Sequence, residues 1–165
     1  DIGKLVQTAE DDLTIDEVAE IFDEVKKAKR ILYLTDNAGE IAFDRLLVDE
    51  LKKLGAYVIV AVKGGPIIND ATMKDAKYVG MDRIADAVIT TGTDAVGLMP
   101  AQCSRKFLDA YSSVDLILAK GMGYVETLTE VELAFPHALL LRTKCQPVAN
   151  FLDVEKDKNV AKLML

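Results

Sequence analysis

Cysteine and histidine are scarce in this sequence, and their scarcity excludes several kinds of site. Two cysteines among 165 residues, Cys103 and Cys145, lie far apart with no C-x-x-C spacing. Neither a zinc knuckle nor a thioredoxin-like centre is therefore predicted, and a reduced, cytoplasmic setting is the better expectation. The single histidine, His137, also disfavours zinc, whose usual ligands are His and Cys.

The chain also lacks a basic block, a long apolar run and an initiating methionine. Asp and Glu number 27 against 20 Lys and Arg, and the formal net charge of −7 opposes binding to a phosphate backbone, so no nucleic acid is expected as a partner. No apolar run approaches the ~18 residues of a membrane span, and no signal peptide is seen, so no membrane partner is expected. The missing methionine suggests a piece of a longer protein.

Half of the residues are hydrophobic, which suits a single soluble domain over residues 1–165. Short apolar runs recur along the chain, and each is nearly continuous rather than alternating, as is typical of strands buried on both faces of a parallel sheet. The predicted strands are residues 31–34, 57–62, 87–89, 116–119 and 138–141. Segments with helical periodicity separate them, so the fold class predicted is layered α/β with a mainly parallel sheet.

Helices are predicted in the intervals between these strands. Thr14 and Glu17 have capping-box spacing and predict the start of the first helix, which ends in a basic stretch at Arg30. The other predicted helices are residues 40–54, 71–79, 101–111 and 127–133. The charged tail from Asp153 to Lys162 is expected to be a solvated terminal segment.

Polar residues follow every predicted strand, at the edge of a parallel sheet where ligands bind. Asp36-Asn37 follows the first strand and Asn69-Asp70 the second, which would direct two carboxylates and two amide oxygens toward one point. Such ligands suit Mg²⁺ or Mn²⁺. The alternative is that these residues only cap the helices that follow.

Two glycine loops with flanking lysines are candidates for phosphate binding. Lys63-Gly64-Gly65 and Lys120-Gly121-Met122-Gly123 could present backbone N–H groups and an ammonium to a phosphate, or could be ordinary turns. Neither G-x-G-x-x-G after the first strand nor a P-loop is present, so dinucleotide and P-loop nucleotide binding lose their main support. The cysteines are expected to be small buried or semi-buried residues rather than nucleophiles, and a structural role is expected for His137.

Taken together, these loops resemble the damage-control phosphatase family, long catalogued as a domain of unknown function. The resemblance extends over residues 31–149. It rests on Asp36-Asn37-Ala38-Gly39-Glu40 with Asp44 downstream, residues 63–72 (KGGPIINDAT) with Asp75, residues 120–123 and Lys144-Cys145. It implies a Rossmann-like three-layer α/β/α fold with a mainly parallel central sheet. It also implies divalent-metal-dependent hydrolysis of a phosphate monoester of a small metabolite, such as a sugar phosphate or a damaged cofactor intermediate.

The same resemblance assigns expected roles to particular residues. Asp36, Asn37 and Asp70 would hold the divalent metal, which could be Mg, Mn, Co or Ni. Glu40 would lie beside the metal and the phosphate, and Lys144 would bind the phosphate. Asn69, Lys120 and Gly121 would line the pocket. The catalytic set is therefore Asp36, Glu40, Asp70 and Lys144, with either water or Asp36 as the nucleophile.

Two departures from the family pattern support an alternative hypothesis about function. Tyr124 stands where relatives commonly have Asn, which affects substrate specificity. Relatives also carry a helical region before the first strand, and residues 1–30 are expected to hold only a helical remnant of it, without the residues that cover the pocket. The alternative function is a non-catalytic module that binds a phosphorylated metabolite, and a homo-oligomer is compatible with either function.

Overall fold

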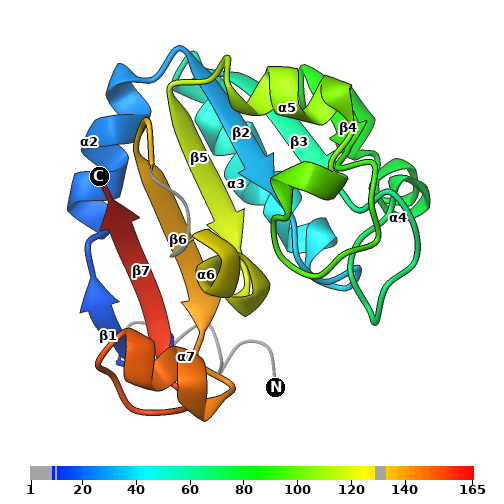
Figure 1. Ribbon diagram of the computed structural model, residues 1–165. Helices are drawn as coiled ribbons and strands as arrows, with labels where there is room; N and C mark the ends of the chain where they lie inside the picture. The colour runs from blue at the N-terminus through cyan, green and yellow to red at the C-terminus, as the bar shows by residue number, and fades with distance from the viewer. Residues whose placement is uncertain (1–8, 10, 129–132) are drawn as a thin grey trace.

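A computed structural model describes residues 9, 11–128 and 133–165, which are organised around one seven-stranded sheet (Figure 1). The order across the sheet is β1-β7-β6-β5-β2-β3-β4. Strands β2 to β6 are parallel, β7 is antiparallel to β6, and β1 is parallel to β7. The strands are β1 (Leu13–Asp16), β2 (Arg30–Leu34), β3 (Tyr57–Val62), β4 (Ala87–Thr90), β5 (Leu116–Lys120), β6 (His137–Arg142) and β7 (Asn159–Met164).

Helices cover both faces of the sheet and give the three-layer α/β/α arrangement that the sequence predicts. On one face, α2 (Val18–Lys27), α3 (Ile41–Lys53) and α4 (Met73–Tyr78) pack on a core that includes Tyr33 and Val60. On the other, α5 (Arg105–Tyr111), α6 (Met122–Leu128) and α7 (Gln146–Phe151) pack on a core that includes Phe107. Two 3-10 helices, η1 (Met81–Arg83) and η2 (Pro100–Gln102), complete the connections. Within the described ranges, no helix combines the length and apolar character needed to cross a bilayer.

Every predicted apolar run is confirmed as a strand, because these segments are buried on both faces. Ile31 to Leu34 of β2, for example, are fully buried, with one face packed in each core. The helix predicted over 40–54 is confirmed as α3 and that over 71–79 as the shorter α4. The helix predicted over 101–111 is shorter too, because η2 occupies its start.

Three local predictions are wrong. Thr14 lies in β1 and caps no helix, because α2 begins only after Glu17, which makes no side-chain cap hydrogen bond. The tail from 153 to 162 is not simply solvated, since β7 pairs with both β6 and β1. The helix predicted over 127–133 is replaced by α6, which ends at Leu128, and residues 129–132 of that prediction lie outside the described ranges.

The strand order reverses direction between β2 and β5. From β2 the chain adds β3 and β4 toward one edge, and then returns to place β5, β6 and β7 toward the other. At such a switch point the loops after the two central strands diverge and leave a crevice at the carboxyl edge of the sheet. Here the two loops are the one that begins at Thr35, after β2, and the one that begins at Gly121, after β5.

Candidate active site

The loops after β2 and β3 are joined by backbone hydrogen bonds. Asn37 and Asp70 form an isolated antiparallel bridge. The N–H of Ala38 donates to the carbonyl of Asn69 at 2.8 Å, and the N–H of Ala71 donates to the carbonyl of Asp36 at 2.7 Å. The Asp and Asn residues predicted as metal ligands are therefore brought together by the backbone itself.

The side chain of Asn37 links two of the carboxylates. Its Nδ2 donates to Oδ2 of Asp36 at 2.9 Å and to Oε1 of Glu40 at 2.7 Å. With the amide nitrogen occupied in this way, Oδ1 of Asn37 is left as an acceptor that can bind a cation. Two carboxylates and an amide oxygen therefore form an all-oxygen donor set at Asp36, Asn37 and Asp70.

Negative charge is crowded around Asp36. Burial, reinforced by the carboxylates of Glu40 and Asp70, raises the pKa of Asp36 to about 6. Burial also raises the pKa of Asp70, although the ammonium of Lys63 opposes this shift. A bound divalent cation would relieve this crowding, and oxygen donors are the ligands that hard cations prefer. In the described part of the chain, no group of three or more His, Cys, Asp or Glu side chains is arranged to hold a metal ion, so the fit rests on including the amide of Asn37.

Lys63 supports the loops beneath Asp70. Its ammonium donates to the carbonyls of Ala95 at 2.8 Å and Gly97 at 3.0 Å, and lies 3.7 Å from Oδ2 of Asp70. Burial lowers the pKa of Lys63. The side chain is only 3% exposed, so the expectation that Lys63 presents its ammonium to a phosphate is wrong.

The glycine loops also use their N–H groups within the fold. The N–H of Gly64 donates to the carbonyl of Thr93 at 2.9 Å, and that of Gly121 donates to the carbonyl of Leu140 at 3.0 Å. The N–H groups of Gly64 and Gly121 are therefore not free for a phosphate, while phosphate binding by the other N–H groups of these loops stays a prediction. Gly121 has another purpose, because its φ is +86° and a Cβ there would lie 2.3 Å from Cγ of Asp36. Its lack of a side chain makes room for the Asp36 carboxylate.

Lys120, at the end of β5, lies between two carboxylates of α3 and its N-cap. Its ammonium lies 3.2 Å from Oε2 of Glu40 and 3.0 Å from Oδ1 of Asp44. Burial opposes the charged form, but Asp44 and Glu40 outweigh it and raise the pKa of Lys120. For Glu40, burial is likewise outweighed by hydrogen bonds from Asn37 and Lys120, which lower its pKa. Both groups are therefore charged at neutral pH.

Asp44 is held beneath this pair in the protein interior. It is 3% exposed and accepts a hydrogen bond from the hydroxyl of Tyr33 at 2.8 Å, while burial raises its pKa. Its Oδ2 has no hydrogen-bond partner among the described residues. The position of Lys120 is therefore set by a buried carboxylate as well as by Glu40 at the surface of the site.

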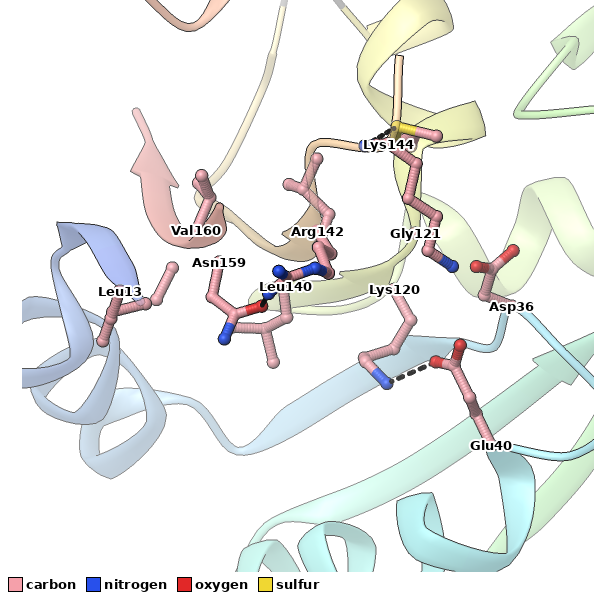
Figure 2. A pocket seen from close by; sticks show the side chains of 13 residues that line it. Leu13, Asp36, Glu40, Lys120, Gly121, Leu140, Arg142, Lys144, Asn159 and Val160 are labelled. Atoms are coloured by element: carbon pink, nitrogen blue, oxygen red, sulfur yellow. Dashed lines mark hydrogen bonds and ion pairs between the residues drawn. The ribbon is translucent and has the colours of Figure 1, made fainter. Parts of the chain in front are cut away.

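Two cavities meet at Asp36. The larger, about 350 Å³, contains Glu40, Lys120, Gly121 and Lys144 near the switch point and extends across β6 to β7 (Figure 2). The smaller, about 180 Å³, is lined among others by Asn37, Lys63, Asn69, Asp70, Tyr124 and Lys144. Asp36, Met122 and Lys144 line both. Every site residue that the sequence predicts therefore lies on one or both cavities, while the roles assigned to them stay predictions.

The sequence analysis missed several residues of the site. Tyr33 lies inside an apolar run, and its partner Asp44 was not assigned any role. Arg142 and Asn159 line the far end of the larger cavity, but they belong to the end of β6 and to the unpredicted strand β7. The signal that could have found Arg142 is its place directly after the fifth apolar run, two residues before Lys144.

His137 lies away from these cavities, as expected for a structural residue. It is fully buried, its Nε2 is 2.9 Å from the hydroxyl of Tyr111, and its Nδ1 is 2.8 Å from the carbonyl of Phe135. Burial lowers its pKa, so the ring is neutral at pH 7. Its ring also stacks on that of Phe135.

Comparison with known proteins gives consistent matches. The family described as "Damage-control phosphatase ARMT1-like domain" matches residues 2–160. An uncharacterised protein of Methanocaldococcus jannaschii is 46% identical over 96% of this chain and 54% of its own length. A protein of Pyrococcus horikoshii named a damage-control phosphatase is 45% identical over 88% of this chain and 50% of its own. A further protein named a damage-control phosphatase, from Archaeoglobus fulgidus, is 42% identical over 82% of this chain and 46% of its own length.

A solved structure agrees with the sequence matches. The crystal structure of a DUF89 family protein from Pyrococcus horikoshii superposes with a TM-score of 0.86 at 44% identity, covering 90% of this chain and 52% of that one. The chain thus spans about half the length of the curated relatives it matches.

Proposed function

The chain belongs to the ARMT1-like damage-control phosphatase family, and from that premise we propose that it hydrolyses a phosphate monoester of a small metabolite with the help of a divalent cation. The observation that carries the proposal is the crowding of Asp36, Asn37 and Asp70 at adjoining strand ends, where the pKa of Asp36 is raised to about 6. That crowding favours a cation at this point. The substrate is expected to be a sugar phosphate or a damaged cofactor intermediate.

Asp36, Asn37 and Asp70 would hold the cation, which could be Mg²⁺, Mn²⁺, Co²⁺ or Ni²⁺. When bound, such a cation supplies Lewis acidity, which offsets charge on the phosphoryl oxygens and promotes the ionisation of water. Lys144 is exposed and lines both cavities, so it is well situated to neutralise the phosphate. The ammonium of Lys120, oriented by Glu40 and Asp44, adds a second positive charge nearby.

Asp36 has two candidate roles that share one requirement. As a nucleophile its carboxylate would attack phosphorus, and as a base it would orient and deprotonate the attacking water. Both roles need the ionised carboxylate, and a cation bound beside Asp36 would favour that form. Gly121 leaves the space in which this carboxylate lies.

The test is release of inorganic phosphate from a panel of phosphate monoesters, with each of the four cations and with a chelator as the metal-free control. Asp36→Ala and Asp70→Ala are each expected to lower the cation-dependent rate by more than about 100-fold. Asp82→Ala, which removes an exposed carboxylate in η1, is the matched control and should leave the rate unchanged. Unchanged turnover in either site variant would refute the ligand assignment.

Binding of phosphate monoesters without turnover, across all four cations, would instead favour the non-catalytic module. In that case the wild-type chain would bind the esters and release no phosphate above the chelator control. The two results separate an enzyme from a binding domain on the same set of samples.

A further inference from the structure

The larger cavity has two chemically different ends (Figure 2). Asp36, Glu40 and Lys120 form the end near the proposed cation. Arg142 and Asn159 form the far end, at the paired termini of β6 and β7. Leu140 lies between these ends, whereas Val160 on β7 and Leu13 on β1 line the cavity beyond Arg142.

The size of the cavity fits a short molecule that reaches both ends. Leu140 pairs with Lys120 in the parallel register, and Arg142 lies two residues further along β6. A strand spacing of ~4.8 Å and a rise of ~3.3 Å per residue place the Cα atoms of Lys120 and Arg142 about 8 Å apart. A volume of about 350 Å³ is near the lower limit of small-molecule sites, which begin at roughly 300 Å³.

Arg142 has donors to spare at the far end. Its Nη1 makes both of its protein hydrogen bonds, to Oδ2 of Asp12 at 3.0 Å and to Oδ1 of Asn159 at 3.1 Å. Among the residues that the structure describes, Nη2 and Nε of Arg142 have no protein acceptor, and the side chain is 40% exposed. A guanidinium held on one nitrogen in this way can use its remaining N–H groups to bind a carboxylate.

The charges at the far end favour an anion. Asp12 is shared by two cations, since Nζ of Lys158 lies 3.5 Å from Oδ1 and Nη1 of Arg142 contacts Oδ2. The hydrogen bond from Arg142 holds the pKa of Asp12 below its ordinary value, so the carboxyl stays ionised. One carboxylate therefore faces two positive groups. Between Lys120 and Arg142 the wall includes Leu140, whose side chain cannot hydrogen-bond the hydroxyls of a sugar.

We infer that Arg142 binds a carboxylate at the end of the substrate opposite its phosphate, so that the substrate is a phosphorylated short-chain carboxylic acid rather than a polyhydroxylated sugar phosphate. This inference rests on the proposed function, because it takes the phosphate to lie at the Asp36 end. Arg142 is then a specificity residue, and Leu140 packs against the connecting carbon chain.

The test uses two probes that differ only at the far end, 3-phosphoglycerate and glycerol 3-phosphate, in which CH₂OH replaces the carboxylate. Their dissociation constants are measured by isothermal titration calorimetry in the presence of Mg²⁺. The wild-type chain is expected to bind 3-phosphoglycerate about 10-fold or more tightly than glycerol 3-phosphate. Arg142→Ala should bring that ratio close to one and change the affinity for glycerol 3-phosphate by less than about twofold.

Three variants separate recognition of the carboxylate by Arg142 from a merely structural ion pair with Asp12. Lys158 is the other partner of Asp12 and does not line the cavity, so Lys158→Ala should keep the preference for 3-phosphoglycerate. Asp12→Asn removes the carboxylate that competes for Arg142 and should keep or increase the preference. If Arg142 acted only by pairing with Asp12, Asp12→Asn would abolish the preference as Arg142→Ala does. Arg142→Lys, which keeps the charge without the planar fork, should retain only part of the preference. Thermal melts report whether each variant is folded.

The inference is overturned if wild type shows no preference or no measurable binding of 3-phosphoglycerate. It is equally overturned if Asp12→Asn abolishes the preference, or if Arg142→Ala weakens both probes alike. The calorimetric titration measures binding and does not depend on hydrolysis, so failure of the proposed function is detected separately, by the phosphate-release assay. A chain that prefers the carboxylate and never releases phosphate would refute hydrolysis and leave the role of Arg142 intact.

Discussion

The two cavities that meet at Asp36 hold their lysines in opposite ways. In the smaller cavity, neutral backbone carbonyls bind the ammonium of Lys63, and burial lowers its pKa. In the larger cavity, the carboxylates of Glu40 and Asp44 bind the ammonium of Lys120 and raise its pKa. Lys120 is therefore held by two ion pairs, whereas Lys63 is held mainly by carbonyls and lies 3.7 Å from the nearer carboxylate oxygen, that of Asp70. The two lysines should therefore differ in how much each contributes to stability.

Replacing each lysine by methionine tests this difference, and Lys120→Met should have the largest effect. It leaves buried Asp44 without its counter-charge, which should cost about 3–5 kcal/mol of unfolding free energy. Lys63→Met leaves mainly carbonyls unpaired and should cost about 1–3 kcal/mol. Urea denaturation at pH 7 measures both.

A second substitution provides the control for Lys120→Met. Adding Asp44→Asn removes the buried charge, so the double variant should recover at least about half of the lost stability, as expected for coupled sites. The comparison fails if Lys63→Met lowers the unfolding free energy more than Lys120→Met does. It also fails if adding Asp44→Asn to Lys120→Met lowers the unfolding free energy further.

Lys144 belongs to both cavities and should affect turnover without affecting stability. Because its side chain is exposed, Lys144→Ala should leave the urea midpoint unchanged. Losing one charge-assisted hydrogen bond to the phosphate should lower kcat/KM by about 10-fold or more. Lys106→Ala, in α5, is a matched exposed control. An unaffected kcat/KM in Lys144→Ala would remove this residue from the site.

The smallest effect is expected from Asp36→Asn in the absence of metal. The pKa of Asp36 is raised from 3.8 to about 6, so between these values the folded protein binds more protons than the unfolded chain. The unfolding free energy of wild type therefore falls as pH rises through this window. Asp36→Asn avoids that loss and should be about 1 kcal/mol more stable at pH 8, after allowance for partial exposure, but not at pH 4.

Thermal melts in a chelator buffer at the two pH values measure this effect. Asp82→Asn, at an exposed carboxylate, should show no such pH-dependent gain. A second series with Mg²⁺ sharpens the result, because the cation should raise the Tm of wild type and leave that of Asp36→Asn nearly unchanged. Equal Tm values for wild type and Asp36→Asn at pH 8 would contradict the crowding of charge at Asp36.

Much of the fold could be predicted because burial determines it. Strands covered by helices on both faces are continuous apolar runs, and so β2 to β6 were identified. By contrast, β1 alternates in burial over only Leu13–Asp16, and β7 contains the polar residues Asn159 and Lys162. Both lie toward one edge of the sheet, where polar residues are tolerated, so their sequences do not distinguish them from caps or tails.

The location of the site was predictable for a different reason. Polar residues directly after buried strands must collect at one edge of a parallel sheet, and the bridge between Asn37 and Asp70 results from this. Contacts that depend on side-chain packing were not predictable. The hydrogen bond between Tyr33 and Asp44 joins β2 to α3 inside the core, and the pairing of Arg142 with Asn159 depends on the register of β6 with β7.

The pairing of β1 with β7 has a consequence for the order of folding. Residues 17–158 separate these two strands, so this sheet edge cannot form until synthesis has passed residue 164. Leu13, Asn159 and Val160, all from this edge, help to line the larger cavity. Closing so long a loop is entropically slow, and the Asp36 end of the cavity needs no such closure. A nascent chain would thus form the loops that carry Asp36 and Asp70 before it forms the β1–β7 edge.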